Sequence, residues 1–323
     1  MAPNFTRVNL VERALASMKL SDAIEGFFIC KTGNRKGDFS PKTIKLYQHL
    51  LRKVVESLGD PEIETITSRD LEKFMASLAK PQRDLSTYAQ DNYYKAIRSF
   101  WNWAVDSVNA QPAHKSLRQP IVIAESVVPF SKQDIKRILA ACEFTTRTCP
   151  VSRKPYTQSR PTETRDKTII YLLLDTGLRI GELSRLTIDD LFMDHNTLRV
   201  TPYHTGKKSR PREIPFGRVT KRWLWQFITE YKPANNRPVF GLTTTGLSRL
   251  FARLEKSSGI AGVHAHRFRH TFAIEYIRNS GDIFSLQYIL GHSDLTMCRR
   301  YLAIVKADAQ NAHARASPVD NWL

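Results

Sequence analysis

Helix start signals, each followed by apolar residues at helical spacing, recur along most of this sequence. Ser40-Pro41 places an N-cap residue before a proline at the first helical position, and an apolar pattern of helical period follows as far as Gly59. Thr67 and Ser131 each begin a capping-box pattern, with an aspartate three residues later and an apolar helical pattern behind it. These signals predict a chain that is mainly α-helical.

The length and the prolines indicate two domains. The chain has 323 residues, more than one domain usually contains, and the helical period fades between residues 111 and 129, where prolines accompany basic residues. We therefore predict a helical N-terminal domain at 1–110, a linker at 111–129 and a second domain at 130–323. The helix after Ser86 carries an aromatic stripe whose period matches a buried face, so we assign the stripe to the core rather than to a surface that stacks on bases.

In the second domain the pattern predicts helices around a small β-sheet. A buried helix from Ile169 to Leu174 ends at Thr176-Gly177, and β-branched and aromatic segments at 197–203 and 212–216 predict a hairpin. The polar, basic segment from Thr145 to Thr164 is predicted to be a loop. Further helices are predicted at 219–231, 245–258 and 283–290.

The charge balance indicates a polyanionic partner. Lys and Arg together number 49 against 31 Asp and Glu, a formal net charge of +18, which favours nucleic acid over an anionic membrane. The longest wholly apolar run, Ile169 to Leu174, is too short to cross a bilayer, and the N-terminus lacks the apolar core of a signal peptide. We expect a soluble, cytoplasmic protein without a membrane partner.

The sequence also predicts that no cofactor or metal is needed. Its four cysteines are widely scattered, which fits neither a disulfide framework nor a zinc site. It contains no Walker loop and no dinucleotide glycine fingerprint, and its acidic residues do not cluster as they would around Mg²⁺.

The stretch from His264 to Ile304 gathers phosphate ligands around a potential nucleophile. It holds two histidines and an arginine close together, then a Leu-Gly-His turn, then Tyr301 beside two arginines. On a helix His266 and Arg269 project from one side, and this spacing selects His266 over His264. A tyrosine hydroxyl has a pKa of about 10, so it needs cationic neighbours or a base in order to attack.

Four ordered segments resemble one family, the tyrosine recombinases, which include the phage-type and Xer-like integrases. Together they span nearly the whole second domain, whereas the first domain resembles the family's core-binding domain only in length, position and helix content. The family's fold is a mainly helical two-domain clamp on DNA with a small β-sheet. The segments are TGLRIGEL (Thr176–Leu183), TGKKSRPREIP (Thr205–Pro215), HRFRHTFA (His266–Ala273) and LGHSDLTMCRRY (Leu290–Tyr301).

The resemblance implies a role for each matched polar residue. Arg179 and Arg269 would clamp the scissile phosphate, because a guanidinium donates two parallel hydrogen bonds and keeps its proton. Lys207 would protonate the departing 5′ oxygen, and Lys208 is the alternative if the turn is shifted by one residue.

The other matched positions would complete the reaction centre. His266 would act as acid, base or hydrogen-bond donor, His292 would donate to the phosphate, and Tyr301 would attack phosphorus to form a 3′-phosphotyrosyl link. Glu182 matches an acidic position that could orient the first arginine, or it is a solvated carboxylate. His270 also matches the motif, with a structural role favoured.

The resemblance further implies double-stranded DNA as partner, with two protomers per site and a tetramer in the synapse. The tail 306–323 is predicted to dock on a neighbouring protomer, and docking on its own chain is the alternative. Candidate DNA contacts outside the reaction centre are Lys95, Arg98, Arg153, Lys154, Lys208, Arg210, Arg267, Arg299 and Arg300.

Three other functions compete with a recombinase or integrase. A type IB topoisomerase shares the chemistry, a DNA-binding protein without catalysis would share the fold, and an RNA-binding protein would share only the charge. The matched polar positions disfavour a mere binder, which needs no activated tyrosine. Tyr276 and Tyr288 are rival nucleophiles, but both lie in apolar helix patterns that predict core packing.

Overall fold

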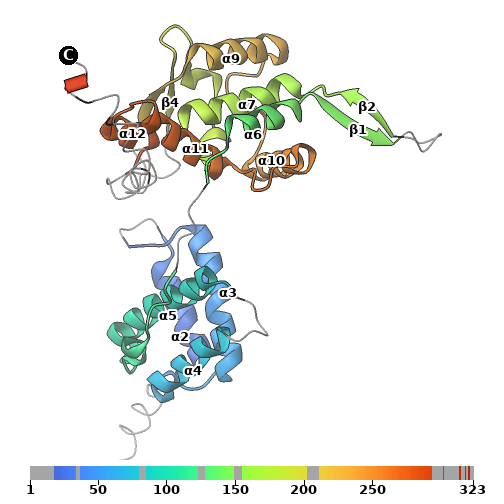
Figure 1. Cartoon of the computed structure of the whole chain (residues 1–323). Coiled ribbons are helices and arrows are strands. Elements are labelled where there is room, and N and C mark those ends of the chain that lie inside the picture. Colours follow the sequence, from blue (N-terminus) through green and yellow to red (C-terminus); the bar gives the residue numbers. More distant parts are fainter. Residues whose placement is uncertain are drawn as a thin grey trace, which may run out of the picture. The chain divides into compact units, whose positions relative to one another are not determined.

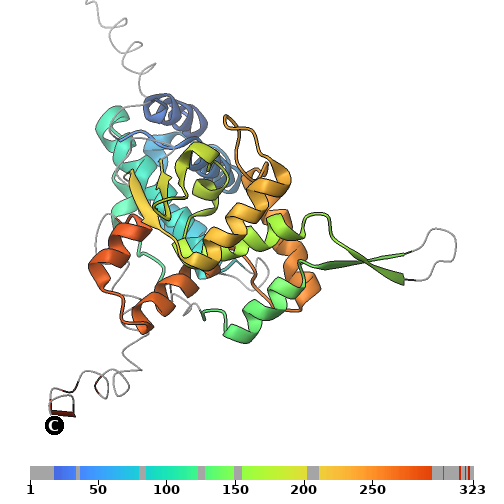
Figure 2. The same ribbon diagram turned by 90° about the horizontal axis from the view of Figure 1, so that it is seen from above.

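A computed structural model describes residues 18–33, 37–79, 85–122, 128–148, 155–201 and 211–292, together with positions 301, 313, 317 and 319–320. Contacts divide the chain into two compact units, Met1–Glu125 and Ser126–Leu323, which we describe separately (Figures 1 and 2). In the parts of the chain that the structure describes, none of the helices is both long enough and apolar enough to span a bilayer.

The first unit is helical, and the helix ends that the local signals predicted are found there. The Ser40 side chain accepts a hydrogen bond from the Thr43 amide, Thr67 and Asp70 form a reciprocal capping box, and Gly59 ends its helix at φ 79°. The elements are α2 (Leu20–Lys31), α3 (Pro41–Leu58), η1 (Ile63–Thr65), α4 (Ser68–Leu78), α5 (Thr87–Val108) and η2 (Ala113–Ser116).

The aromatic stripe of α5 is core, as predicted. Tyr93, Phe100 and Trp101 are buried, and the Phe100 ring packs edge-on against Phe27 of α2. Part of the segment predicted as linker also belongs to this unit: Ala113 and Leu117 are buried in the same core, and the imidazole of His114 lies 2.7 Å from the Asn102 side chain. Apolar side chains near the end of α5 thus hold 113–117 against the helices.

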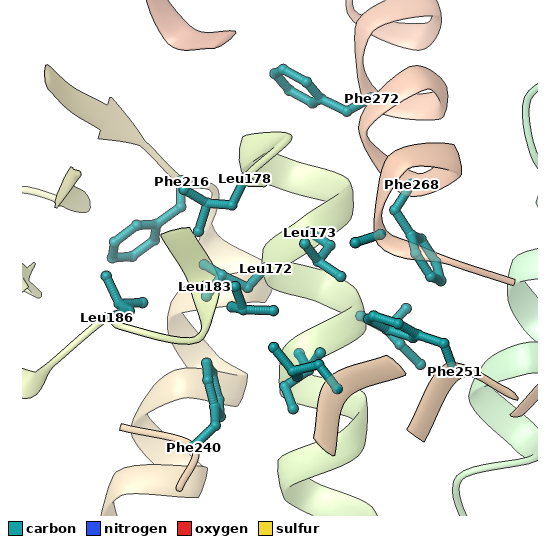
Figure 3. Packing of buried hydrophobic residues seen from close by; sticks show 14 of the residues in the cluster. Leu172, Leu173, Leu178, Leu183, Leu186, Phe216, Phe240, Phe251, Phe268 and Phe272 are labelled. Carbon is teal, nitrogen blue, oxygen red and sulfur yellow. The ribbon is translucent and has the colours of Figure 1, made fainter. Parts of the chain in front are cut away.

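The second unit is built around α7, which packs against α9 and α11. Figure 3 shows Leu172 and Leu173 of α7 among the side chains of neighbouring elements, including Phe251 and Phe268. This confirms the predicted mainly helical fold. The helices are α6 (Lys132–Ala140), α7 (Glu163–Thr176), α8 (Ile180–Leu183), η3 (Ile188–Asp190), α9 (Arg218–Tyr231), α10 (Thr244–Ser258), α11 (Ala265–Arg278) and α12 (Ile283–Leu290).

A small antiparallel sheet accompanies these helices. The predicted hairpin is confirmed by β4 (Thr197–Val200) and β5 (Arg212–Pro215), in which Leu198 lies opposite Ile214. A third strand, β3 (Leu191–Phe192), was not predicted; two residues are too few to show a strand period. The turn of the hairpin lies outside the described residues.

The prediction of a loop over Thr145–Thr164 is wrong. Strands β1 (Phe144–Thr148) and β2 (Pro155–Ser159) pair antiparallel and extend away from the helices as an arm (Figures 1 and 2). Threonines and a tyrosine favour strands here, and they outweigh the prolines and cations on which the loop prediction depended. The base of the arm is fixed, since the Arg160 amide donates to the Glu143 carbonyl at 2.8 Å.

Candidate active site

Arg179 stands at the junction of α7 and α8. Gly177 ends α7 at φ 61°, and a Cβ there would approach Phe272 to 2.6 Å, so the tight turn that brings the chain to Arg179 requires glycine. Arg179 is the N-cap of α8, with a side chain one-third exposed. Its amide and its guanidinium both donate to the Glu182 carboxylate, at 2.9 and 3.0 Å. Glu182 thus orients Arg179, as the resemblance suggested.

Arg212, which sequence reasoning did not single out, holds the other side of Glu182. Both terminal nitrogens of this buried arginine lie 3.1 Å from the two Glu182 oxygens, and its Nε donates to the Ile289 carbonyl at 2.7 Å. Burial alone would raise the pKa of Glu182, but Arg212 and Arg179 outweigh it and hold the pKa below its usual range. The alternative of a solvated carboxylate is therefore wrong.

Arg269 of α11 is buried, with 3% of its surface exposed. Its guanidinium donates to the Gly177 carbonyl and to the Leu290 carbonyl, each at 2.7 Å, and lies 2.9 Å from Nε2 of His292. Burial, with repulsion from Arg179 second, lowers the pKa of Arg269 to about 9. Two guanidinium groups therefore stand close together in a partly dry site, an arrangement that a bound anion would stabilise.

The two predicted histidines both lie near this cation. His292 follows Gly291, where a Cβ would come within 2.8 Å of the Arg212 guanidinium and φ is 62°. His266 lies in the first turn of α11, where burial, followed by repulsion from Arg269, lowers its pKa. Both can present a neutral ring or a donor to a phosphate.

Tyr301 is buried against the same helix. Only 4% of its surface is exposed, and its hydroxyl lies 2.9 Å from Nδ1 of His270. The ring centroids of His270 and His266 are 6.1 Å apart. The fold therefore brings Arg179, Arg269, His266, His292 and Tyr301 into one neighbourhood, with His270 in direct contact with the tyrosine hydroxyl.

Several predicted residues lie outside the described part of the chain. They are Arg153, Lys154, Lys207, Lys208, Arg210, Arg299 and Arg300, and most of the tail 306–323.

Three other candidate DNA contacts have partners within the chain. Arg267 donates to the Val128 carbonyl at 3.0 Å and lies 4.1 Å from the centroid of the Phe130 ring. Lys95 pairs with Asp91 at 2.5 Å, and Arg98 donates to a tyrosine hydroxyl of its own helix.

Tyr288, one of the rival nucleophiles, is 56% exposed, so the prediction that it packs in the core is wrong. Helix α12 turns Leu286, Ile289 and Leu290 inward and leaves Tyr288 outside, where its hydroxyl accepts a hydrogen bond from the Glu213 amide. Tyr276 is half-buried and packs on Phe272.

A phosphodiester is the ligand that suits this set of side chains. Guanidinium and imidazole groups can bind its charged oxygens, while the tyrosine hydroxyl supplies a nucleophile. Among the described residues, no group of three or more His, Cys, Asp or Glu side chains is arranged to hold a metal ion.

Comparison with known proteins assigns the class and then the family. One solved structure with the same fold is a Tn1549 transposon integrase in complex with transposon right end DNA. It is 19% identical, the match covers 92% of this chain and 100% of that one, and the TM-score is 0.68. Another is a lambda integrase dimer bound to a core site, with 17% identity, coverage of 92% of this chain and 81% of that one, and a TM-score of 0.69. The fold is that of a DNA integrase. The family model described as Phage integrase family matches residues 130–307, and the chain belongs to that family.

The remaining matches agree with this family. A phage integrase N-terminal SAM-like domain matches residues 34–109. Tyrosine recombinase XerD of Listeria innocua is 25% identical over 299 residues, covering 86% of this chain and 93% of the relative. Tyrosine recombinase XerA of Saccharolobus solfataricus is 28% identical over 285 residues, covering 85% and 86%. The resemblance to Xer-like tyrosine recombinases is confirmed.

Proposed function

We propose that this chain is a site-specific DNA recombinase that cuts and rejoins strands through a covalent 3′-phosphotyrosine, without metal or nucleotide cofactor. Membership of the phage integrase family and the likeness to named tyrosine recombinases support the activity. They do not favour the two main alternatives, a type IB topoisomerase or a binder without catalysis.

The buried Arg269 carries the proposal. Burying a cation costs free energy unless an opposite charge compensates it, and the described part of the chain offers Arg269 two carbonyls and a histidine rather than a carboxylate partner. Glu182, whose charge also acts on Arg269, is hydrogen-bonded to Arg212 and Arg179. A phosphodiester anion would supply the missing charge and lie beside both guanidinium groups.

In the reaction the Tyr301 hydroxyl attacks phosphorus, the P–O5′ bond breaks, and the 3′ phosphate becomes esterified to the tyrosine. Arg179, Arg269 and His292 stabilise the negative charge that builds on the other phosphate oxygens, His266 acts as donor or acid–base group, and Lys207 gives its proton to the 5′ oxygen. The new phosphodiester replaces the old one, so no external energy source is needed. Attack by a 5′ hydroxyl reverses the step and rejoins the strand.

A nicked suicide substrate carrying the candidate recombination site tests the function. The short 5′ fragment diffuses away after cleavage, so the covalent intermediate accumulates and survives denaturation as a slower band. We expect such a band with the wild-type chain. Intact binding without any band would refute the catalytic proposal.

Lys207→Ala is expected to slow cleavage of an ordinary substrate by roughly a hundred- to ten-thousandfold, because the leaving oxygen loses its proton donor. A substrate whose 5′ oxygen is replaced by sulfur needs no acid and should restore the rate. Lys208→Ala is the matched control and should be near wild type on both substrates. If only Lys208→Ala is slow and rescued, the acid is Lys208.

The basic side chains outside the reaction centre would contact the DNA backbone. We include Arg153 and Lys154, which lie in the sequence between the two strands of the arm, and the segments with Lys208, Arg210, Arg299 and Arg300. Lys95, Arg98 and Arg267 would need to add a phosphate contact to their present partners. Substituting a true contact with Gln should weaken binding and reduce its salt dependence. Unchanged affinity and salt dependence would remove that residue from the interface.

We further propose a dimer on each site and a tetramer in the synapse, in the cytoplasm. A lambda integrase tetramer bound to a Holliday junction has the same fold at 18% identity (TM-score 0.66), which supports the arrangement. The tail 306–323 would dock on a neighbouring protomer. Truncation after residue 305 should then reduce synapsis while DNA binding persists, and unchanged synapsis would leave docking on the same chain as the alternative.

A further inference from the structure

We propose that His270 is a catalytic residue: it accepts the proton of Tyr301 as the hydroxyl attacks phosphorus. The inference rests on the recombinase function proposed above. Its basis is a direct contact between the reacting atom and a titratable group, since the hydroxyl oxygen of Tyr301 lies 2.9 Å from Nδ1 of His270. The ring centroids are 5.5 Å apart. The distance of 2.9 Å between the hydroxyl oxygen and Nδ1 lies within the range that proton transfer to a general base requires.

The surroundings hold this contact in place. His270 projects from the middle of α11, between the buried residues Arg269 and Thr271, so its backbone position is fixed by the core. The tyrosine ring is itself part of that core and only 4% exposed. Water therefore has little access to the hydroxyl, and a protein side chain must receive its proton.

The other histidines of the site are arranged for other tasks. Nε2 of His292 faces the Arg269 guanidinium at 2.9 Å; because arginine has only donors, that nitrogen must be the acceptor and is unavailable to the tyrosine. Nδ1 of His264 accepts from the Arg267 amide at 3.2 Å. His266 is one turn before His270 on the exposed side of α11. Among the described residues, His270 is the histidine that meets the nucleophile.

The proton inventory of the step balances. With its own proton on Nε2, the neutral ring accepts the Tyr301 proton at Nδ1 and becomes imidazolium, while the O–P bond forms and the P–O5′ bond breaks. The 5′ oxygen takes its proton from the separate acid assigned to Lys207. On rejoining, the 5′ hydroxyl attacks, the tyrosine oxygen leaves phosphorus, and His270 returns the proton.

Charges around His270 make the transfer depend on bound DNA. Arg269 and Arg179 are cationic, His266 and His292 are titratable, and Glu182 is occupied by the two arginines that it pairs with. A protonated His270 would add a third positive charge to those of Arg269 and Arg179, and like charges repel. A phosphodiester between the arginines offsets this repulsion, so the tyrosine would be deprotonated when its target is in place.

His270→Asn tests the proposal, because the Asn side-chain oxygen can stand near the position of Nδ1 and accept the hydroxyl hydrogen bond, yet it cannot take a proton. We expect single-turnover cleavage of the suicide substrate to fall roughly a hundred- to ten-thousandfold and to lose the wild-type rise with pH in the region where histidine titrates. The sulfur leaving group should not restore the rate, in contrast to Lys207→Ala. His195→Asn, at an exposed position, is the matched control.

Two results would overturn the proposal. Wild-type cleavage by His270→Asn would make the contact a structural hydrogen bond, and rescue by the sulfur leaving group would mean that His270 acts on the 5′ oxygen. If the Asn variant fails to bind DNA or to unfold cooperatively, His270→Gln is measured in the same way. Failure of the recombinase function looks different, because the wild-type chain itself would then form no covalent complex.

Discussion

Tyr301→Phe is expected to abolish the covalent protein–DNA complex and to leave DNA binding at the wild-type level. The substitution removes only the hydroxyl, the atom that the proposed reaction joins to phosphorus. Loss of the nucleophile in other covalent enzymes lowers the rate on the order of a millionfold, which puts the residual reaction below detection on a gel. No other proposed variant should have a larger effect on cleavage.

The structure explains why the protein should otherwise tolerate this change. The Tyr301 ring is buried in the core of the second unit, and phenylalanine fills the same volume. The hydrogen bond to His270 is lost, which costs about 1 kcal/mol of the free energy of unfolding. Urea unfolding of the two proteins should therefore give nearly the same midpoint.

Tyr288→Phe is the matched control for the suicide-substrate assay. Tyr288 is exposed, and its hydroxyl accepts a hydrogen bond from the Glu213 amide, so its loss should alter neither the band nor the affinity. A band that persists in Tyr301→Phe and disappears in Tyr288→Phe would reassign the nucleophile. Tyr276→Phe would be examined next.

The sequence predicted those parts of the fold that depend on local interactions. The caps at Ser40, Thr67 and Ser131 and the glycine stops are governed by hydrogen bonds within a few residues, so their positions follow from the pattern alone. The arm at Phe144–Ser159 was missed because strand pairing depends on a partner segment, and prolines and cations concealed the strand propensity of its threonines.

Prediction of the site was limited by contacts between distant segments. Arg179, Arg269, His266, His292 and Tyr301 were predicted through the motifs that contain them. Arg212 also lies in a matched segment, but its role depends on facing inward from β5, where alternate residues are buried. The inward alternation was the signal that could have identified it, because a charged side chain that faces the core must find a partner there.

The contact of His270 with Tyr301 gave no comparable signal in the sequence. The two residues are 31 positions apart, and no local pattern brings their side chains together. From the sequence, His270 was only a position that matches the family motif, and a structural role was favoured for it.

Arg212→Met is expected to lower the free energy of unfolding by about 3–5 kcal/mol at neutral pH. The methionine can fill much of the aliphatic volume, but Glu182 would remain buried without the partner that meets both of its oxygens. The Ile289 carbonyl would also lose its donor, so the turn that leads through Gly291 to His292 would be held less firmly. Cleavage should fall as well, because Glu182 would lose the contacts with Arg212 that hold it in place and would orient Arg179 less firmly.

The double variant Arg212→Met/Glu182→Leu separates stability from activity. Removing both charges leaves no unpaired buried charge, so the double variant should regain most of the lost stability. It should not regain cleavage, since Arg179 would still lack the carboxylate that accepts from its amide and its guanidinium. Urea unfolding and suicide-substrate cleavage of the single and double variants measure the two quantities.

The pH dependence of stability gives an independent check on the same pair. The pKa of Glu182 is below its ordinary value of 4.5 in the folded protein, so the pair stabilises the fold above that pH, and the contribution is lost as pH falls through the folded pKa. In Arg212→Met burial would instead favour the protonated acid. The stability gap between wild type and Arg212→Met should therefore begin to narrow above pH 4.5, as the buried acid of the variant takes up its proton, and narrow further as pH falls below 4.5. A gap that stays constant from pH 7 into this range would mean that Arg212 stabilises the fold through packing and the Ile289 carbonyl, and the claim that it holds Glu182 ionised would be withdrawn.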